Sequence, residues 1–187
     1  MFNWWKTQRS QAETASEIYG AIVTRARNPA FYRTCGVSDT AEGRYEMVVL
    51  MLALVLERLR QAPSAPFNLQ RSLVEAFVTD MDDCLREMGV GDLTVPKKVK
   101  RAAAGLMERM DQYRTARAAS DTASLTSALT GNIPGLAATP GGADSLAASV
   151  RADAAHLARL ADDAIVQGKI SFYSEPDSSA QTPRMTP

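Results

Sequence analysis

The chain has 187 residues, of which 45% are hydrophobic and 22% charged, and its 21 basic residues balance its 21 acidic residues to a formal net charge of zero. A chain of this length folds by default as one domain and buries enough surface to need no disulfides or metals. A disulfide-stapled miniprotein and a wholly disordered chain are therefore excluded. Dedicated nucleic-acid binders are usually strongly basic, so the balance argues against that class and leaves room only for a local basic patch.

Side chains that build metal or thiol sites are scarce. Cys35 and Cys84 lie far apart and form no CxxC motif, and His156 is the single histidine. We expect two free thiols in a reducing compartment, although the sequence leaves a Cys35–Cys84 disulfide open. The N-terminal sequence MFNWWK lacks the pattern of a secretory signal, and the longest apolar run, residues 47–56, is about half of the roughly 20 residues that span a bilayer. We therefore expect a cytoplasmic protein without a membrane span.

Apolar residues recur at helical spacing along most of the chain, and no stretch alternates as a half-buried strand does. The pattern predicts an all-α fold, a single bundle-like domain of about five to six helices. The first helix is predicted over about 10–27, and Pro29 ends it. A capping-box-like start at Asp39 then begins a long helix that reaches about residue 61. Its segment 47–56 is apolar on all sides, so it is predicted to be the central helix of the core.

Two amphipathic helices are predicted next. Apolar residues step by three or four over 69–88, and Gly89 suits a left-handed C-terminal cap. The following helix is predicted to start at Asp92 or Thr94, with an apolar stripe over 95–113. Its opposite side is basic, and this basic face consists of Lys97, Lys98, Lys100 and Arg101.

The last third of the chain is more weakly patterned. Residues 118–144 are rich in Ala, Ser, Thr and Gly and are expected to be a looser region with loops. A final helix is predicted over 144–167, stopped by Gly168. We divide the chain into an N-terminal aromatic segment (1–9), a helical domain (10–172) and a disordered Ser/Pro/Thr-rich tail (173–187).

Three patterns could carry chemistry, and each has a plainer structural interpretation. The carboxylates within 80–87 suggest a metal cluster, but Arg86 stands at the fourth position after Asp82, where a DDxxD site needs an acid. The glycines of 89–92 match no phosphate loop and fit a capped helix turn. His156 lies off the apolar stripe of its helix and has no paired nucleophile nearby. We predict no catalytic residue, no metal and no cofactor, and hence not an enzyme.

The basic face lies near a helix N-terminus, where positive charge opposes the helix dipole. It can be interpreted as a contact surface for the phosphates of RNA or lipid headgroups, or as a solvated face balanced by neighbouring carboxylates. Trp4 and Trp5 can likewise anchor the chain at a membrane or partner surface, or pack back onto the bundle. Residue types alone leave these alternatives open.

Two multi-residue motifs follow each other in the chain. The first runs from Tyr19-Gly20-Ala21-Ile22-Val23 through Asn28-Pro29 and Gly36-Val37-Ser38-Asp39-Thr40 to Gly43-Arg44-Tyr45-Glu46. The second runs from Asp80-Met81-Asp82 through Leu85-Arg86-Glu87-Met88-Gly89-Val90-Gly91-Asp92 to Lys97-Lys98-Val99-Lys100. Together they resemble the ubiquinol-cytochrome c chaperone family over about residues 15–115, with a weaker echo at 168–172. The resemblance implies an all-helical, non-catalytic assembly factor of respiratory complex III that binds newly made cytochrome b.

The resemblance has one departure and does not by itself locate the binding surface. The family pattern continues after Leu50 with a histidine, whereas this chain has Met51, so no role of that imidazole, including haem contact, is carried over. We hypothesise a partner-binding surface from Arg86 to Arg101, with a second candidate at the start of the central helix. The hypothesised residues are Arg44, Tyr45, Glu46, Arg86, Glu87, Gly89, Gly91, Asp92, Lys97, Lys98, Lys100 and Arg101.

The partners implied by the resemblance are cytochrome b as client and a small partner chaperone subunit, and the basic face is the expected contact for the ribosome or an anionic membrane surface. The location would be cytoplasmic, with peripheral contact at the inner face of the cytoplasmic membrane. Two alternatives remain. One is a general helical adaptor at that membrane surface without a respiratory client. The other is a small helical enzyme, which would need a pocket with convergent polar groups.

Overall fold

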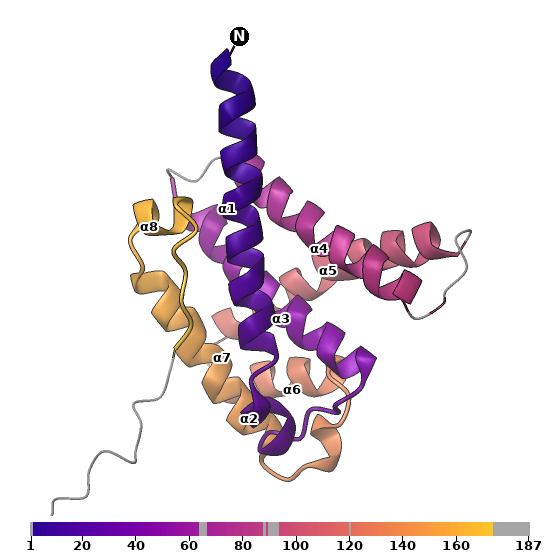
Figure 1. The fold of residues 1–187 in the computed structure, drawn as a ribbon. Coiled ribbons are helices and arrows are strands. Elements are labelled where there is room, and N and C mark those ends of the chain that lie inside the picture. Colours follow the sequence, from indigo (N-terminus) through magenta and orange to yellow (C-terminus); the bar gives the residue numbers. More distant parts are fainter. Residues whose placement is uncertain (1, 64–66, 88, 90–93, 120, 174–187) are drawn as a thin grey trace, which may run out of the picture.

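The computed structural model describes residues 2–63, 67–87, 89, 94–119 and 121–173, and every regular element within these ranges is a helix (Figure 1). The elements are α1 (Phe2–Ala26), α2 (Pro29–Arg33), α3 (Ala41–Gln61), α4 (Phe67–Glu87), α5 (Val95–Ala118), α6 (Thr122–Asn132), the 3-10 turn η1 (Leu136–Ala138), α7 (Gly142–Arg159) and α8 (Asp162–Val166). The all-α prediction is confirmed. The division of the chain into segments stays a prediction, because the tail from residue 174 onward lies outside the described residues.

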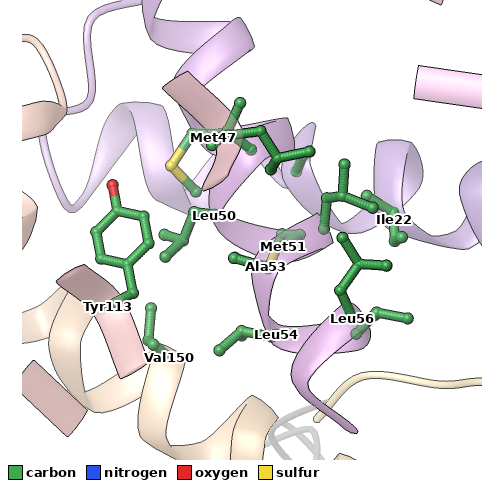
Figure 2. Close-up of a cluster of buried hydrophobic side chains, with 14 of the residues drawn as sticks. Ile22, Met47, Leu50, Met51, Ala53, Leu54, Leu56, Tyr113 and Val150 are labelled. Atoms are coloured by element: carbon green, nitrogen blue, oxygen red, sulfur yellow. The ribbon is translucent and has the colours of Figure 1, made fainter. Parts of the chain in front are cut away.

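Helix α3 forms the centre of the fold, as its uninterrupted apolar run predicts. Every residue from Val49 to Leu56 is buried, and α1, α4, α5 and α7 pack around this helix. Figure 2 shows its side chains pointing to several sides at once, toward Ile22 of α1, Tyr113 of α5 and Val150 of α7. Met51, at the position where the resembled family pattern has histidine, is fully buried in this cluster, so the residue packs the core in this chain.

The start of α3 corrects the predicted cap. Thr40, not Asp39, is the N-cap residue, and its hydroxyl accepts a hydrogen bond from the Gly43 N–H at 3.1 Å. An N-cap side chain reaches the amide three residues ahead, so Asp39 stands one position too early. Its carboxylate instead accepts a hydrogen bond from Arg44 Nε at 2.7 Å. The helix end at Gln61 agrees with the prediction.

Helix α1 begins at Phe2, well before the predicted start near residue 10, and the side chains of 2–10 lie outside what the structure describes. Its inner face packs on the core, where Ile18, Ile22 and Ala26 are fully buried. The short helix α2 follows at once and was not predicted. It is capped by the Asn28 side chain, which accepts the Ala30 N–H at 2.9 Å.

Helices α4 and α5 run beside each other and extend to one side of the molecule in Figure 1. Gly89 follows α4 with φ +76° and donates its N–H to the Arg86 carbonyl at 2.9 Å, which confirms the left-handed C-terminal cap. The second predicted start of α5, Thr94, is its N-cap residue, although its side chain makes no capping hydrogen bond; Asp92 lies outside the described residues. The stripe of α5 is buried at Leu106 and Tyr113.

The Ala/Ser/Thr/Gly-rich region contains a helix that was not predicted. In α6 the apolar side chains that reach the core are Leu125 and Leu129, a single pair at i,i+4, which is too short a pattern to identify a helix from sequence. Asp121 caps this helix by accepting the Ser124 N–H at 2.6 Å. The turn η1 then buries Leu136 in the same core.

The predicted final helix over 144–167 is wrong in one respect, because it is two helices. Arg58 of α3 explains the break: its guanidinium donates to the Leu157 carbonyl at 3.0 Å, to the Leu160 carbonyl at 2.7 Å and to the Asp162 carboxylate at 2.6 Å. These bonds satisfy carbonyls that continuation of α7 would have used. Gly168 has φ +79° and ends α8 as predicted.

Candidate interaction groove

An open groove of about 740 Å³ lies where the start of α3, the end of α4 and the first half of α5 meet. Its floor and walls include Tyr45, Met81, Leu85, Ala102, Ala104 and Gly105. Charged side chains also line it: Glu42 from α3, and Arg101, Glu108 and Arg109 from α5. Of the hypothesised partner-binding residues, Tyr45 and Arg101 line this groove, one from each of the two surface candidates.

Tyr45 ties the three walls together. Its ring is half-buried, 6.1 Å between centroids from the ring of Phe77 in α4, and its hydroxyl points to the Ala102 carbonyl of α5 at 3.4 Å. Burial, followed by the nearby Glu46 carboxylate, raises the pKa of this phenol, so it stays a neutral hydroxyl at physiological pH. Tyr45 therefore offers the groove an apolar ring surface.

Beneath this groove, Glu46 and Arg109 form a two-bonded ion pair. Arg109 Nε donates to Glu46 Oε2 at 2.7 Å, and Nη2 donates to Oε1 at 2.9 Å. Glu46 is 4% exposed, and its carboxylate raises the pKa of Arg109 chiefly through the side-chain hydrogen bond. The hypothesis placed Glu46 on the partner surface, whereas the structure places it below that surface, where it joins α3 to α5.

Sequence reasoning did not find Arg109, although a signal was available. Arg109 occupies a position on the apolar stripe of α5, between the buried residues Leu106 and Tyr113. An arginine within an apolar stripe predicts a carboxylate partner on another element, but the sequence does not identify which carboxylate it is. The hydroxyl of Tyr113 lies close enough to this pair to sense both charges, and among the described residues it has no hydrogen-bond partner.

The exposed charges around the groove differ in whether they are paired. Arg44 pairs with Asp39 at 2.7 Å, and Arg86 pairs with Asp82 at 2.6 Å, so the residue that breaks the DDxxD spacing neutralises the first acid of that motif. On the basic face, Lys97, Lys100 and Arg101 are exposed, and within the described ranges none of them makes an ion pair. Glu87 is exposed, and Gly89 forms the helix cap. The side chain of Lys98, and Gly91 and Asp92, lie outside the described residues.

The patterns weighed for metal and catalytic chemistry have ordinary contacts. Asp80 accepts a hydrogen bond from the Tyr19 hydroxyl at 2.8 Å, which joins α4 to α1. His156 Nε2 lies 2.9 Å from Ser171 Oγ. In the described ranges no group of three or more His, Cys, Asp or Glu side chains is arranged to hold a metal ion. Cys35 is buried, Cys84 is exposed, and both thiols are free as predicted.

One property bears on membranes. None of the helices in the described ranges is both long enough and apolar enough to cross a bilayer.

Comparison with known proteins identifies the family. The profile described as "Ubiquinol-cytochrome C chaperone" matches residues 33–172, which includes the groove. The chain belongs to the ubiquinol-cytochrome c chaperone family. A solved structure, the crystal structure of the Cbp3 homolog from Brucella abortus, is similar at 33% identity with a TM-score of 0.79, over 93% of this chain and 97% of that chain. None of the curated proteins compared matches the chain.

Membership in this family agrees with the resemblance read from the two sequence motifs. It supports a role in the assembly of respiratory complex III. A chaperone family also implies a client protein and a non-catalytic role.

Proposed function

We propose that this protein is an assembly chaperone of respiratory complex III that holds newly made cytochrome b in the groove between α3, α4 and α5. One observation carries the location of the site. The first family motif contributes Tyr45 to the groove, and the second contributes Met81 and Leu85, although the two motifs are distant in sequence. Family membership supports the client class.

The groove suits binding without chemistry. Its floor is largely apolar, and burial of apolar client surface contributes about 2.5 kcal/mol per 100 Å² before the cost of ordering the client is subtracted. The buried carboxylate beneath the groove is already ion-paired, since Glu46 is bound to Arg109. A site of this kind holds a client and releases it, and it offers no poised nucleophile or base.

We also propose where the chaperone acts and with whom. Arg101 makes one edge of the groove positive, and the exposed Lys97 and Lys100 on the same helix extend this edge. That edge is the part of the protein we expect to face the ribosome or the anionic inner face of the cytoplasmic membrane while the client is being made. A small partner subunit, if required, would co-purify with the chaperone and its client.

The deciding experiment is a deletion of the gene in its native host. Membranes are assayed for haem b and haem c by reduced-minus-oxidised spectra and for quinol–cytochrome c reductase activity. Selective loss of both, restored by the wild-type gene, supports the proposal. Normal complex III in a deletion strain that carries no second copy of the gene contradicts it.

Complementation variants test the site itself. The triple charge reversal K97E/K100E/R101E is expected to restore complex III poorly. The control is R33E, because Arg33 is an exposed arginine on α2, away from the groove. Lipid flotation of the protein without selective capture of cytochrome b would favour the alternative, a general adaptor at the membrane surface.

A further inference from the structure

The walls of the groove restrict the backbone conformation of what can bind in it. The described walls belong to helices α3, α4 and α5, whose interior amides and carbonyls are bonded within each helix, so no strand edge is offered. An extended segment buried there would leave its own N–H and C=O groups without partners. A helix satisfies these groups internally and can present an apolar face to the groove.

The α5 wall of the groove contains a glycine, Gly105, at a position where the fold would accept a larger residue. Gly105 lies in the interior of α5, where glycine is unfavourable relative to alanine. A Cβ added there would meet only Arg109 Nη1, at 3.8 Å, which is an ordinary contact. The missing side chain leaves room for close approach of a second helix, because small residues let helix backbones come near each other.

The charges on the rim specify the occupant further. Arg101 lines the groove, Lys97 and Lys100 are exposed on the same helix, and among the described residues none of the three has an ion-pair partner. They stand in the first turns of α5, where the helix dipole is also positive. A carboxylate brought by the partner into the groove would meet Arg101, and Lys97 and Lys100 would add positive charge from the same helix.

Two carboxylates give other parts of the rim the opposite sign. Glu108 follows Arg101 by seven residues, about 10 Å along the helix, and Glu42 stands on the α3 wall. A uniformly anionic partner such as a nucleic acid would be repelled at these two positions. A lipid bilayer has no helix of its own that could occupy a groove between three helices. Because the rim carries both positive and negative charges, it favours a protein segment that has acidic charge only where it meets the positive part of the rim.

We infer that the groove takes one amphipathic helix of the client, apolar on the face that lies over Gly105 and carrying a carboxylate where it meets Arg101. The inference deepens the proposed function, since it names the chemistry of the segment that is held. It applies to the groove even if the client is a different protein.

The test uses hydrocarbon-stapled peptides of about 14 residues, roughly four helical turns, so that all are equally helical. Each has a leucine face and one varied terminal residue, which is Glu, Gln or Lys. Fluorescence anisotropy with the full-length protein should give affinities in the order Glu, Gln, Lys, with about a tenfold span. Replacement of the leucine face by alanine should abolish binding. R101E should reverse the order, whereas the control R33E should preserve it.

Two leucine variants test the groove independently of charge. Gly105→Leu fills the space over α5 and should weaken the Glu peptide at least tenfold. Gly20→Leu adds the same side chain in α1, where nothing lies within 4 Å of an added Cβ, and should leave binding unchanged. Thermal unfolding checks that both variants are folded.

The inference is overturned if Gly105→Leu and Gly20→Leu bind the peptide equally, or if the terminal charge has no effect. Its failure is separable from failure of the proposed function. Normal complex III in the deletion strain, together with blocked peptide binding in Gly105→Leu, would remove cytochrome b as client and keep the helix-binding groove. Lost complex III together with equal peptide binding would do the opposite.

Discussion

The buried Glu46–Arg109 pair allows the sharpest stability prediction, because its two members differ in their access to water. The Glu46 side chain is 6% exposed and the Arg109 side chain 23% exposed. Two single substitutions that keep volume and remove charge, Arg109→Met and Glu46→Leu, each orphan one partner. The double substitution removes both charges together.

The expected magnitudes follow from that difference. Arg109→Met leaves a carboxylate buried without a partner, and breaking a buried pair in this way costs about 3–5 kcal/mol. Glu46→Leu leaves a guanidinium that lines the groove and can turn its tip to water, so the cost should be about 2 kcal/mol. The double variant should lie within about 1 kcal/mol of the wild type, because a hydrophobic pair can replace a buried ion pair.

The assay is urea unfolding of the wild type, both singles and the double, with the coupling energy taken from the cycle. The Glu57–Arg117 pair, 2.5 Å apart and joining the same two helices, is the matched control. Its side chains are 17% and 22% exposed, so Arg117→Met should cost less than Arg109→Met. If Glu46→Leu is as damaging as Arg109→Met, or the double variant is worse than either single, the argument from burial is refuted.

Three further outcomes are expected. Gly135 (φ +93°) and Gly141 (φ +71°) both need glycine, but a Cβ at Gly135 would lie 2.4 Å from a backbone oxygen and one at Gly141 in open space, so Gly135→Ala should lower the unfolding midpoint far more than Gly141→Ala. Hydrogen bonds to the Asp121 carboxylate at the start of α6, chiefly from a backbone amide, lower the pKa of this carboxyl group. Its contribution to stability is therefore present above the unfolded-state pKa and is lost as pH falls through the folded-state pKa. Urea unfolding near pH 6 and pH 3 should show that Asp121→Asn loses less stability on acidification than the wild type. Ellman's reagent should modify Cys84 in the native protein and Cys35 only after unfolding, and two fast native reactions would contradict the burial of Cys35.

The sequence predicts the fold well where one segment determines its own environment. The run over 47–56 is apolar on every side, and only a central helix can bury it, so α3 could be placed without the structure. Prediction failed where distant residues decide. The break between α7 and α8 depends on Arg58, which lies 99 residues before Leu157 in the chain. The local pattern over 144–167 does not contain this contact and therefore predicts one continuous helix.

The candidate site was predictable in its parts and not in its geometry. Both patches were found from sequence, but only the packing of α3 against α5 brings one residue of each, Tyr45 and Arg101, to the same groove. Glu46 shows the limit most clearly. The motif does not show that Glu46 is buried whereas its neighbour Arg44 is exposed. Only the contact with the distant residue Arg109 shows that Glu46 lies beneath the surface.

A net charge of zero conceals how the charges of this protein divide. Arg25 is bound to Asp153 at 2.9 Å, and Arg58, Arg109 and Arg117 are likewise bound to carboxylates of other helices, so these charges cancel inside the fold. The surplus that remains at the start of α5 is therefore available to a partner even though the total is neutral. Reversal of a charge in the first group should unfold the protein, whereas reversal at Arg101 should leave it folded and change only what it binds. A variant set drawn from both groups separates the two roles in one experiment, since unfolding and binding would respond to different arginines.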